Sequence, residues 1–471
     1  MKRAAERAVA IVVGLSAVVL GCTEAATREP PRLNVDVGGA PGAFAPYQPP
    51  IVTAPPAGAS GAGGTGGASG AGAGGMVATS GAGGKASGAG AVLLGFIPTA
   101  ISDDGQVVIG VSEEAPARAA RWSAHEGGRI LSPGAIQGQP EVAALSANGE
   151  ISVGFTVETV SGRPFATVWN GFQPDYFPSV PMGTRDMTAA VGISQDGHII
   201  IGTASNSGDV SGASVATVVW TNLDWAIVGA LPGDSGSEPT VMNRTGTAIA
   251  GFSYAGTKEA RRAFLFRADT GVTELQPPSS AERIVPRVIA DSGDLVFADR
   301  FSGPTESPQT RLDALVWDHG APVKLPRCPS EGTSRVVALA AKTPLLLGAC
   351  SNAFDDADAT DETPFVVDLA SSPMTLTMLP RATAIDRATP VGISADASVI
   401  AGLGRGAARE PIIQLWVARG APIPTNVSVP DLGGAAPRDI DVAAISDDGS
   451  TIVGSAADAN GVRRGWLIHL R

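Results

Sequence analysis

The chain repeats one short supersecondary unit eight times between Thr99 and its C-terminus. In the first copy an apolar strand ends in the polar turn 102–105, and a second apolar strand follows at once. A third strand carries the large residue Trp122, and a fourth leads into an apolar-Pro segment ending at Pro133. Four short strands per roughly 45–50 residues are typical of one blade of a β-propeller. The repeat therefore predicts an all-β protein, an eight-bladed β-propeller of four-stranded antiparallel blades.

Two positions of the repeat can be followed through all eight copies. The turn position falls at Gly105, Gly149, Gly197, Gly246, Gly293, Thr343, Ala397 and Gly449. The anchor of the third strand falls at Trp122, Trp169, Trp220, Phe266, Trp317, Val367, Trp416 and Trp466. Glycine supplies the positive φ that a tight hairpin turn needs. The large anchors are expected to fill the outer part of each wedge-shaped blade.

The apolar-Pro segment occurs one time fewer than the anchor. It ends at Pro133, Pro181, Pro232, Pro277, Pro326, Pro380 and Pro430. The missing copy lies upstream, in residues 92–98, which end in Pro98. An incomplete last sheet would expose unpaired backbone groups at its edge. We therefore expect residues 91–98 to pair beside the strand around Trp466 and to close the ring.

The N-terminus has the pattern of an export signal. Met1-Lys2-Arg3 is positively charged, and the apolar run from Ala8 to Leu20 has the length of a signal peptide. The segment Val19-Leu20-Gly21-Cys22 resembles the lipobox of bacterial lipoproteins. That resemblance implies removal of residues 1–21 and acylation of Cys22, and Thr23 after it favours the outer membrane. The alternative is an ordinary secretory signal with an incidental cysteine.

Residues 22–90 differ in composition from both neighbours. Proline pairs give way to a run of Gly, Ala and Ser, with too little apolar side chain to offset the entropy of ordering. We expect a disordered tether between the anchor and the propeller domain, residues 91–471. The protein would be exported and held at the outer membrane or cell surface, with membrane contact only through the lipid.

Charge and cysteine usage narrow the remaining possibilities. A formal net charge of −12 argues against nucleic acid as a partner. Beyond Cys22 the chain has only Cys328 and Cys350. The repeat places both in adjacent connections on one face, so we predict a disulfide between them in an oxidising compartment. Two separate buried thiols are the alternative. We expect a monomer.

Several copies also resemble a known repeat. The segment 262–266, Arg-Ala-Phe-Leu-Phe, is similar to the "HAFLW" strand of the HAF repeat of extracellular bacterial proteins. The hairpin 444–454 and the segment Asp431-Leu432-Gly433-Gly434 resemble two further parts of that repeat. The name-giving histidine is absent here, and the sixth copy lacks the turn glycine. The resemblance implies a propeller and export, and no defined biochemical activity.

A search for catalytic motifs finds little. The turn Ser194-Gln195-Asp196-Gly197 departs from the Asp box of sialidases, because its glycine comes one residue early and no Thr-Trp follows. The four histidines fall in different copies without metal-ligand spacing. No nucleophile motif or phosphate loop is present. We therefore assign no catalytic or cofactor-binding residue.

One acidic segment, Asp355 to Glu362, lies between the second and third strands of the sixth copy. Its carboxylates could bind Ca²⁺, with Asp356, Asp358, Asp361 and Glu362 as candidate ligands. The segment lacks the glycine that lets a calcium loop turn sharply. A solvated acidic loop without metal is the favoured alternative.

Two classes of function remain. The first is a surface-anchored binding or scaffold propeller for a glycan or an envelope protein. Its ligand face would carry the long loops 203–212, 300–312 and 351–364, with Arg261, Arg262 and Asp355 as polar contacts. The second is a propeller enzyme, a glycosidase or polysaccharide lyase, which would gather acids, bases and aromatics at the channel mouth. The scarcity of aromatics favours binding.

Overall fold

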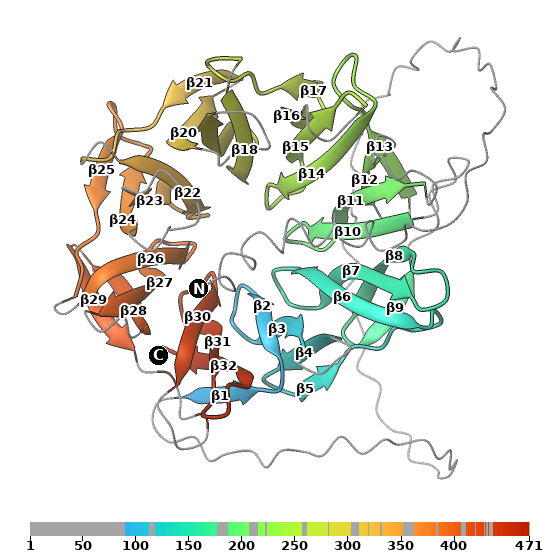
Figure 1. Ribbon diagram of the computed structural model, residues 1–471, viewed down its shortest axis with the longest axis horizontal. Helices are drawn as coiled ribbons and strands as arrows, with labels where there is room; N and C mark the ends of the chain where they lie inside the picture. Colours follow the sequence, from blue (N-terminus) through green and yellow to red (C-terminus); the bar gives the residue numbers. More distant parts are fainter. Residues whose placement is uncertain are drawn as a thin grey trace, which may run out of the picture. The chain divides into compact units, whose positions relative to one another are not determined.

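The regular elements of the computed structural model are all β-strands. They form eight four-stranded antiparallel sheets arranged around a central axis (Figure 1). The predicted eight-bladed β-propeller is therefore confirmed. The structure describes residues 90–470 apart from 113–117, 177–186, 207–214, 222–223, 257–260, 281, 303–309, 319, 330–331, 352–361, 383–384, 407–410, 420, 428, 430–431 and 433–436. In this part of the chain no helix is long and apolar enough to cross a bilayer.

In the first four blades the strands follow chain order from the axis outward. Blade one is β2 (Ile97–Ile101), β3 (Val107–Val111), β4 (Ala119–Ser123) and β5 (Gly127–Ile130). Blade two is β6 (Gly138–Leu145), β7 (Ile151–Glu158), β8 (Pro164–Asn170) and β9 (Gln173–Tyr176). Blade three is β10 (Met187–Ile193), β11 (Ile199–Ser205), β12 (Ala216–Thr221) and β13 (Asp224–Val228). Blade four is β14 (Gly236–Met242), β15 (Ala248–Tyr254), β16 (Arg261–Arg267) and β17 (Gly271–Glu274).

The same order continues until the last sheet. Blade five is β18 (Glu282–Ile289), β19 (Leu295–Ser302), β20 (Thr310–Asp318) and β21 (Ala321–Lys324). Blade six is β22 (Thr333–Leu339), β23 (Leu345–Ser351), β24 (Glu362–Asp368) and β25 (Thr375–Met378). Blade seven is β26 (Ile385–Ile393), β27 (Val399–Gly406), β28 (Pro411–Arg419) and β29 (Ala421–Val427). Blade eight is β30 (Arg438–Ile445), β31 (Thr451–Ala457), β32 (Arg463–His469) and β1 (Ala91–Leu94).

Blade eight takes its outer strand from the beginning of the domain. β1 pairs antiparallel with β32, and Leu93 lies opposite Trp466. Closure of the ring by an N-terminal strand is therefore confirmed, but the closing segment is shorter than expected. Pro98 lies in β2, the inner strand of blade one, where it pairs with Gly110. Only two residues separate β1 from β2, which leaves no room for a separate apolar-Pro link.

The third-strand anchors are buried in seven of the eight blades. Blade four is the exception, because Phe266 is half-buried and Phe264 is the buried ring. In blade eight Trp466 has this same register, since it pairs with Gly454 as Phe264 pairs with Gly251. A Cβ on Gly454 would lie 2.3 Å from the Trp466 ring, so the glycine makes room for it. The blade thus has two anchor positions, two residues apart.

Three of the tryptophan anchors also bond to the preceding blade. The ring Nε1 atoms of Trp169, Trp317 and Trp416 donate to the carbonyls of Ser132, Gln276 and Pro380, at 2.9, 3.3 and 2.6 Å. These carbonyls belong to the apolar-Pro segments that leave the neighbouring blades. The two repeated features therefore act together, because one supplies the donor and the other the acceptor of a contact between blades.

Candidate functional site

The predicted disulfide is present. The sulfurs of Cys328 and Cys350 are 1.98 Å apart and both residues are buried, at 4% and 5% exposure. Cys328 lies in the link from blade five to blade six, and Cys350 lies near the end of β23. The bond therefore fastens the link to the blade that it enters, on the face that carries the loops between second and third strands.

On the same face, the two candidate arginines of β16 are held by neighbours. Arg262 forms ion pairs with Asp234 at 2.9 Å and with Glu274 at 3.1 Å. The Arg261 guanidinium stacks over the ring of Phe252, 5.4 Å from its centre. The structure therefore fixes both arginines within blade four and the link before it.

The proposed calcium ligands fall mostly beyond what can be described. Asp355, Asp356, Asp358 and Asp361 lie in the gap 352–361. Glu362 opens β24, is only 1% exposed, and makes a two-pronged ion pair with Arg335 at 2.5 and 2.6 Å. Among the residues that the structure does describe, no three acidic, histidine or cysteine side chains are grouped as a metal site would need.

A polar cluster lies on the propeller axis, at the end formed by the hairpin turns. Arg244 of blade four forms ion pairs with Asp103 of blade one, at 2.7 Å, and with Asp447 of blade eight. The side-chain amide of Gln195 also donates to Asp103, at 3.2 Å. Burial, and after it repulsion from Asp447, raises the pKa of Asp103 despite the nearby guanidinium. The turns of blades one, three, four and eight are thereby joined across the axis.

Sequence reasoning missed this cluster. Its members occupy the second position of the turn, which reads Asp103, Ala147, Gln195, Arg244, Asp291, Ala341, Ala395 and Asp447 around the ring. A single arginine among acids and small residues at a position that converges on the axis was the available signal.

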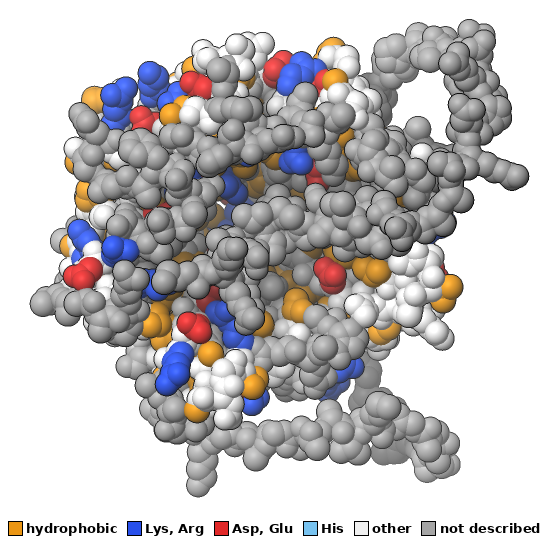
Figure 2. Space-filling view, viewed as in Figure 1, with side chains coloured by type: hydrophobic (Ala, Val, Ile, Leu, Met, Phe, Trp, Pro, Cys, Tyr) orange, Lys and Arg blue, Asp and Glu red, His pale blue; other side chains and the backbone are white. Residues whose placement is uncertain are grey.

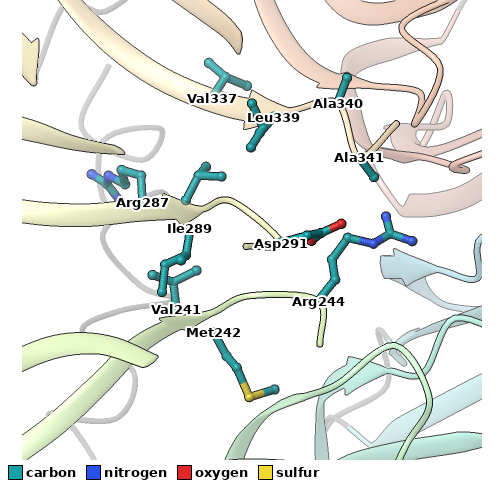
Figure 3. Close-up of a pocket in the computed structure, with 12 residues that line it drawn as sticks. Val241, Met242, Arg244, Arg287, Ile289, Asp291, Val337, Leu339, Ala340 and Ala341 are labelled. Atoms are coloured by element: carbon teal, nitrogen blue, oxygen red, sulfur yellow. The ribbon is translucent and has the colours of Figure 1, made fainter. Parts of the chain in front are cut away.

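Beside this cluster lies a cavity of about 320 Å³. Figure 3 shows its walls, which come from the inner strands and turns of blades four, five and six. Most of its lining is apolar, and Arg244, Arg287 and Asp291 are its charged residues. The cavity thus lies at the hairpin end of the axis, at the opposite end of the blades from the predicted ligand face.

On the face shown in Figure 2, the described acidic and basic side chains are interspersed over several blades. Ion pairs between described residues occur at both ends of the blades: Arg267 pairs with Asp294 at the hairpin end, and Arg300 with Glu282 and Arg464 with Asp458 at the loop end. Such mixed surface pairs contribute little net attraction for a strongly charged polymer.

No model of a known protein family and no curated protein matches the chain. Solved structures of similar fold include a prolyl endopeptidase (TM-score 0.43, 11% identity, 70% of this chain and 47% of that one). They also include an oligogalacturonate lyase in complex with manganese (TM-score 0.42, 11% identity, 80% and 90% covered). A third is a putative TolB from Agrobacterium tumefaciens (TM-score 0.33, 15% identity, 49% and 79% covered). The chain spans about half the length of the endopeptidase. Identities and TM-scores this low say nothing about activity. The eight four-stranded sheets define the chain as a β-propeller protein.

Proposed function

We propose that this propeller is an exported binding or scaffold protein, anchored through Cys22, that holds a glycan or a cell-envelope protein. The observation that carries the proposal is the disulfide between Cys328 and Cys350. Disulfides persist in oxidising compartments, so this bond supports the export signal at the N-terminus. It also stiffens the face on which we expect the partner to bind.

The loop face suits a binding role. Arg262 is fixed by two carboxylates, yet its side chain remains 36% exposed, so a partner meets a guanidinium that is already oriented. Preorganised groups cost less entropy on binding than mobile ones. The expected loops 203–212, 300–312 and 351–364 lie partly in strands, so the connections between second and third strands are shorter than predicted. They are longest in blades three and six, at 206–215 and 352–361, whereas 303–309 of blade five is no longer than 112–118 of blade one. Binding residues are often found on long connections of this kind.

The test is a binding screen of residues 86–471 against arrayed glycans and solubilised envelope fractions. One variant replaces Asp355 to Asp361 with Gly-Ser residues and keeps Glu362, because its ion pair with Arg335 is structural. A second variant is Arg261→Ala. The controls are Asp104→Ala and Asp196→Ala in the hairpin turns.

We expect a partner whose affinity falls in the loop-face variants and is unchanged in the controls. Loss of affinity in the controls alone would place the partner on the hairpin face. If no glycan or envelope component binds, the binding proposal is wrong.

A further inference from the structure

Blade five interrupts a ring of hydrogen bonds that otherwise joins the hairpin turns. Backbone N–H groups donate to the neighbouring turn along the series Asp103→Ala147, Ala147→Gln195, Gln195→Arg244, Lys342→Ala395, Ala395→Asp447 and Asp448→Asp103. Between blades four and five the bond comes from a side chain, since Asn243 donates to the carbonyl of Asp291 at 3.0 Å. Within the described residues no backbone bond joins the turns of blades five and six.

The turns of blades five and six also lack a second feature of the repeat. In five turns a serine hydroxyl accepts a hydrogen bond from the backbone N–H of the first residue of the next strand. In blade four the side-chain oxygen of Asn243 accepts the matching bond, from Ala248. The matching residues of blades five and six are Ala290 and Ala340. These two turns therefore lack the side-chain bond to the next strand that the other six turns have, although they keep their backbone hairpin bonds.

The inner strand of blade five differs as well. Every inner strand has a β-bulge at the same place, and the bulged residues are Thr99, Ala143, Val191, Thr240, Arg287, Val337, Val391 and Ala443. Arg287 is the charged residue of this set. A bulge re-aims a side chain, and bulges are common next to binding sites. A large cation here breaks the pattern of small uncharged residues around the axis.

These departures meet at the cavity of about 320 Å³. Figure 3 shows Arg287 on one side of it and Asp291 on the other, near Arg244. Val241, Met242, Leu339 and further apolar residues line the space around them. Departures from a repeated local pattern are expected at functional sites.

The guanidinium of Arg287 and the carboxylate of Asp291 differ in their bonded partners. Arg287 is oriented by Asp299, whose carboxylate accepts from its Nε at 2.9 Å and from the backbone N–H of Val336 at 2.9 Å. Asp299 is 2% exposed, so the guanidinium is held from the buried side while 39% of its own side chain is exposed. Asp291 is exposed, and its carboxylate has no bonded partner in the described part of the chain. Arg244 attracts it but already bonds Asp103 and Asp447.

We propose that this axial cavity binds a short zwitterionic peptide of two or three residues with an apolar body. The ligand's carboxylate bonds the guanidinium of Arg287 and its ammonium group bonds Asp291. Its apolar side chain packs between Met242 and Leu339. Opposite charges on two sides of an apolar space recognise this chemistry, and a purely anionic ligand would meet the acidic groups around Arg244. The site is independent of the loop-face partner.

The test is calorimetric titration of residues 86–471 with leucine, Ala-Leu and Ala-Ala-Leu. The same peptides with an acetylated N-terminus or an amidated C-terminus are the matched ligands. The three lengths separate a free amino acid from a peptide. Asp291→Asn is the first variant, because an exposed side chain can be changed without unfolding the protein.

The second variant is Arg287→Thr with Asp299→Asn, which restores the bulge residue of blade one and keeps an oxygen to accept from Val336. Thr240→Val, at the same bulge of blade four, is the control. We expect saturable binding of at least one of the two peptides, weakened about tenfold or more by either blocked terminus and by either variant, and unchanged in the control. Leucine should bind more weakly, because its ammonium and carboxylate lie on one carbon. No binding of either peptide at millimolar concentration, or equal binding by blocked and free peptides, would overturn the proposal.

Discussion

Removing the disulfide measures how much stability comes from fastening the link between blades five and six to blade six. Cys328 and Cys350 are 22 residues apart in the sequence, and a cross-link over a loop of this size stabilises by about 3 kcal/mol through the unfolded state. Both sulfurs are buried beside Val336 and Phe365 in one apolar cluster. Cys328→Ala with Cys350→Ala therefore loses packing as well, about 1 kcal/mol for each small void.

Urea unfolding followed by tryptophan fluorescence would separate the two contributions. We expect the reduced wild-type protein to lose about 3 kcal/mol of unfolding free energy and the double-alanine variant to lose more. The variant should not respond to reductant, which serves as the control. Two free thiols in protein isolated from the envelope, or equal stability of oxidised and reduced protein, would refute the reasoning.

Four further predictions follow from individual residues. Gln414 is fully buried, and neither its amide nitrogen nor its oxygen has a partner among the described residues. Gln414→Leu should therefore raise the free energy of unfolding by about 1–2 kcal/mol, and Gln414→Glu should lower it. A lower free energy of unfolding for Gln414→Leu in a urea titration would contradict this. Trp169→Phe should cost about 2 kcal/mol or more, because the carbonyl of Ser132 loses its donor and the smaller ring leaves a void in the core, whereas Phe266→Tyr at the half-buried anchor should cost less. Cys22→Ser should abolish acylation and release the protein from membranes; wild-type protein without an acyl mass on Cys22 would show that the lipobox prediction is wrong. The backbone N–H of Ser398 lowers the pKa of Asp396, so this carboxylate adds stability above its unfolded pKa that is lost as the pH falls through the lowered pKa. Asp396→Asn should flatten the loss of stability below the ordinary aspartate pKa of about 3.9, and an unchanged acid transition would contradict this.

The blades could be predicted from the sequence because the same local features recur in eight copies. Turn glycines, large third-strand residues and the missing apolar-Pro segment together indicated the ring and its closure by an N-terminal strand. The repeat did not select between Phe264 and Phe266, because both are large. Phe264 is the buried one because it packs in an apolar cluster with Ile201 and Ile249.

The axial cluster and cavity could not be reached in the same way. Arg244 lies 141 residues from Asp103 and 203 from Asp447, and no local pattern states that these turns meet. These turns meet because eight inner strands converge on one axis. Their contact can therefore be predicted only once the number and order of the blades are known. The unusual Arg287 likewise stands out only when the eight bulges have been aligned by the structure.

The central claim is that residues 91–471 form eight blades and that β1 closes the last one. A crystal structure of residues 86–471 tests it most directly. We predict eight four-stranded sheets around one axis, with Ala91–Leu94 antiparallel to Arg463–His469 and Leu93 opposite Trp466. A ring of seven or nine blades, or a last sheet whose outer edge is left unpaired, would contradict the account.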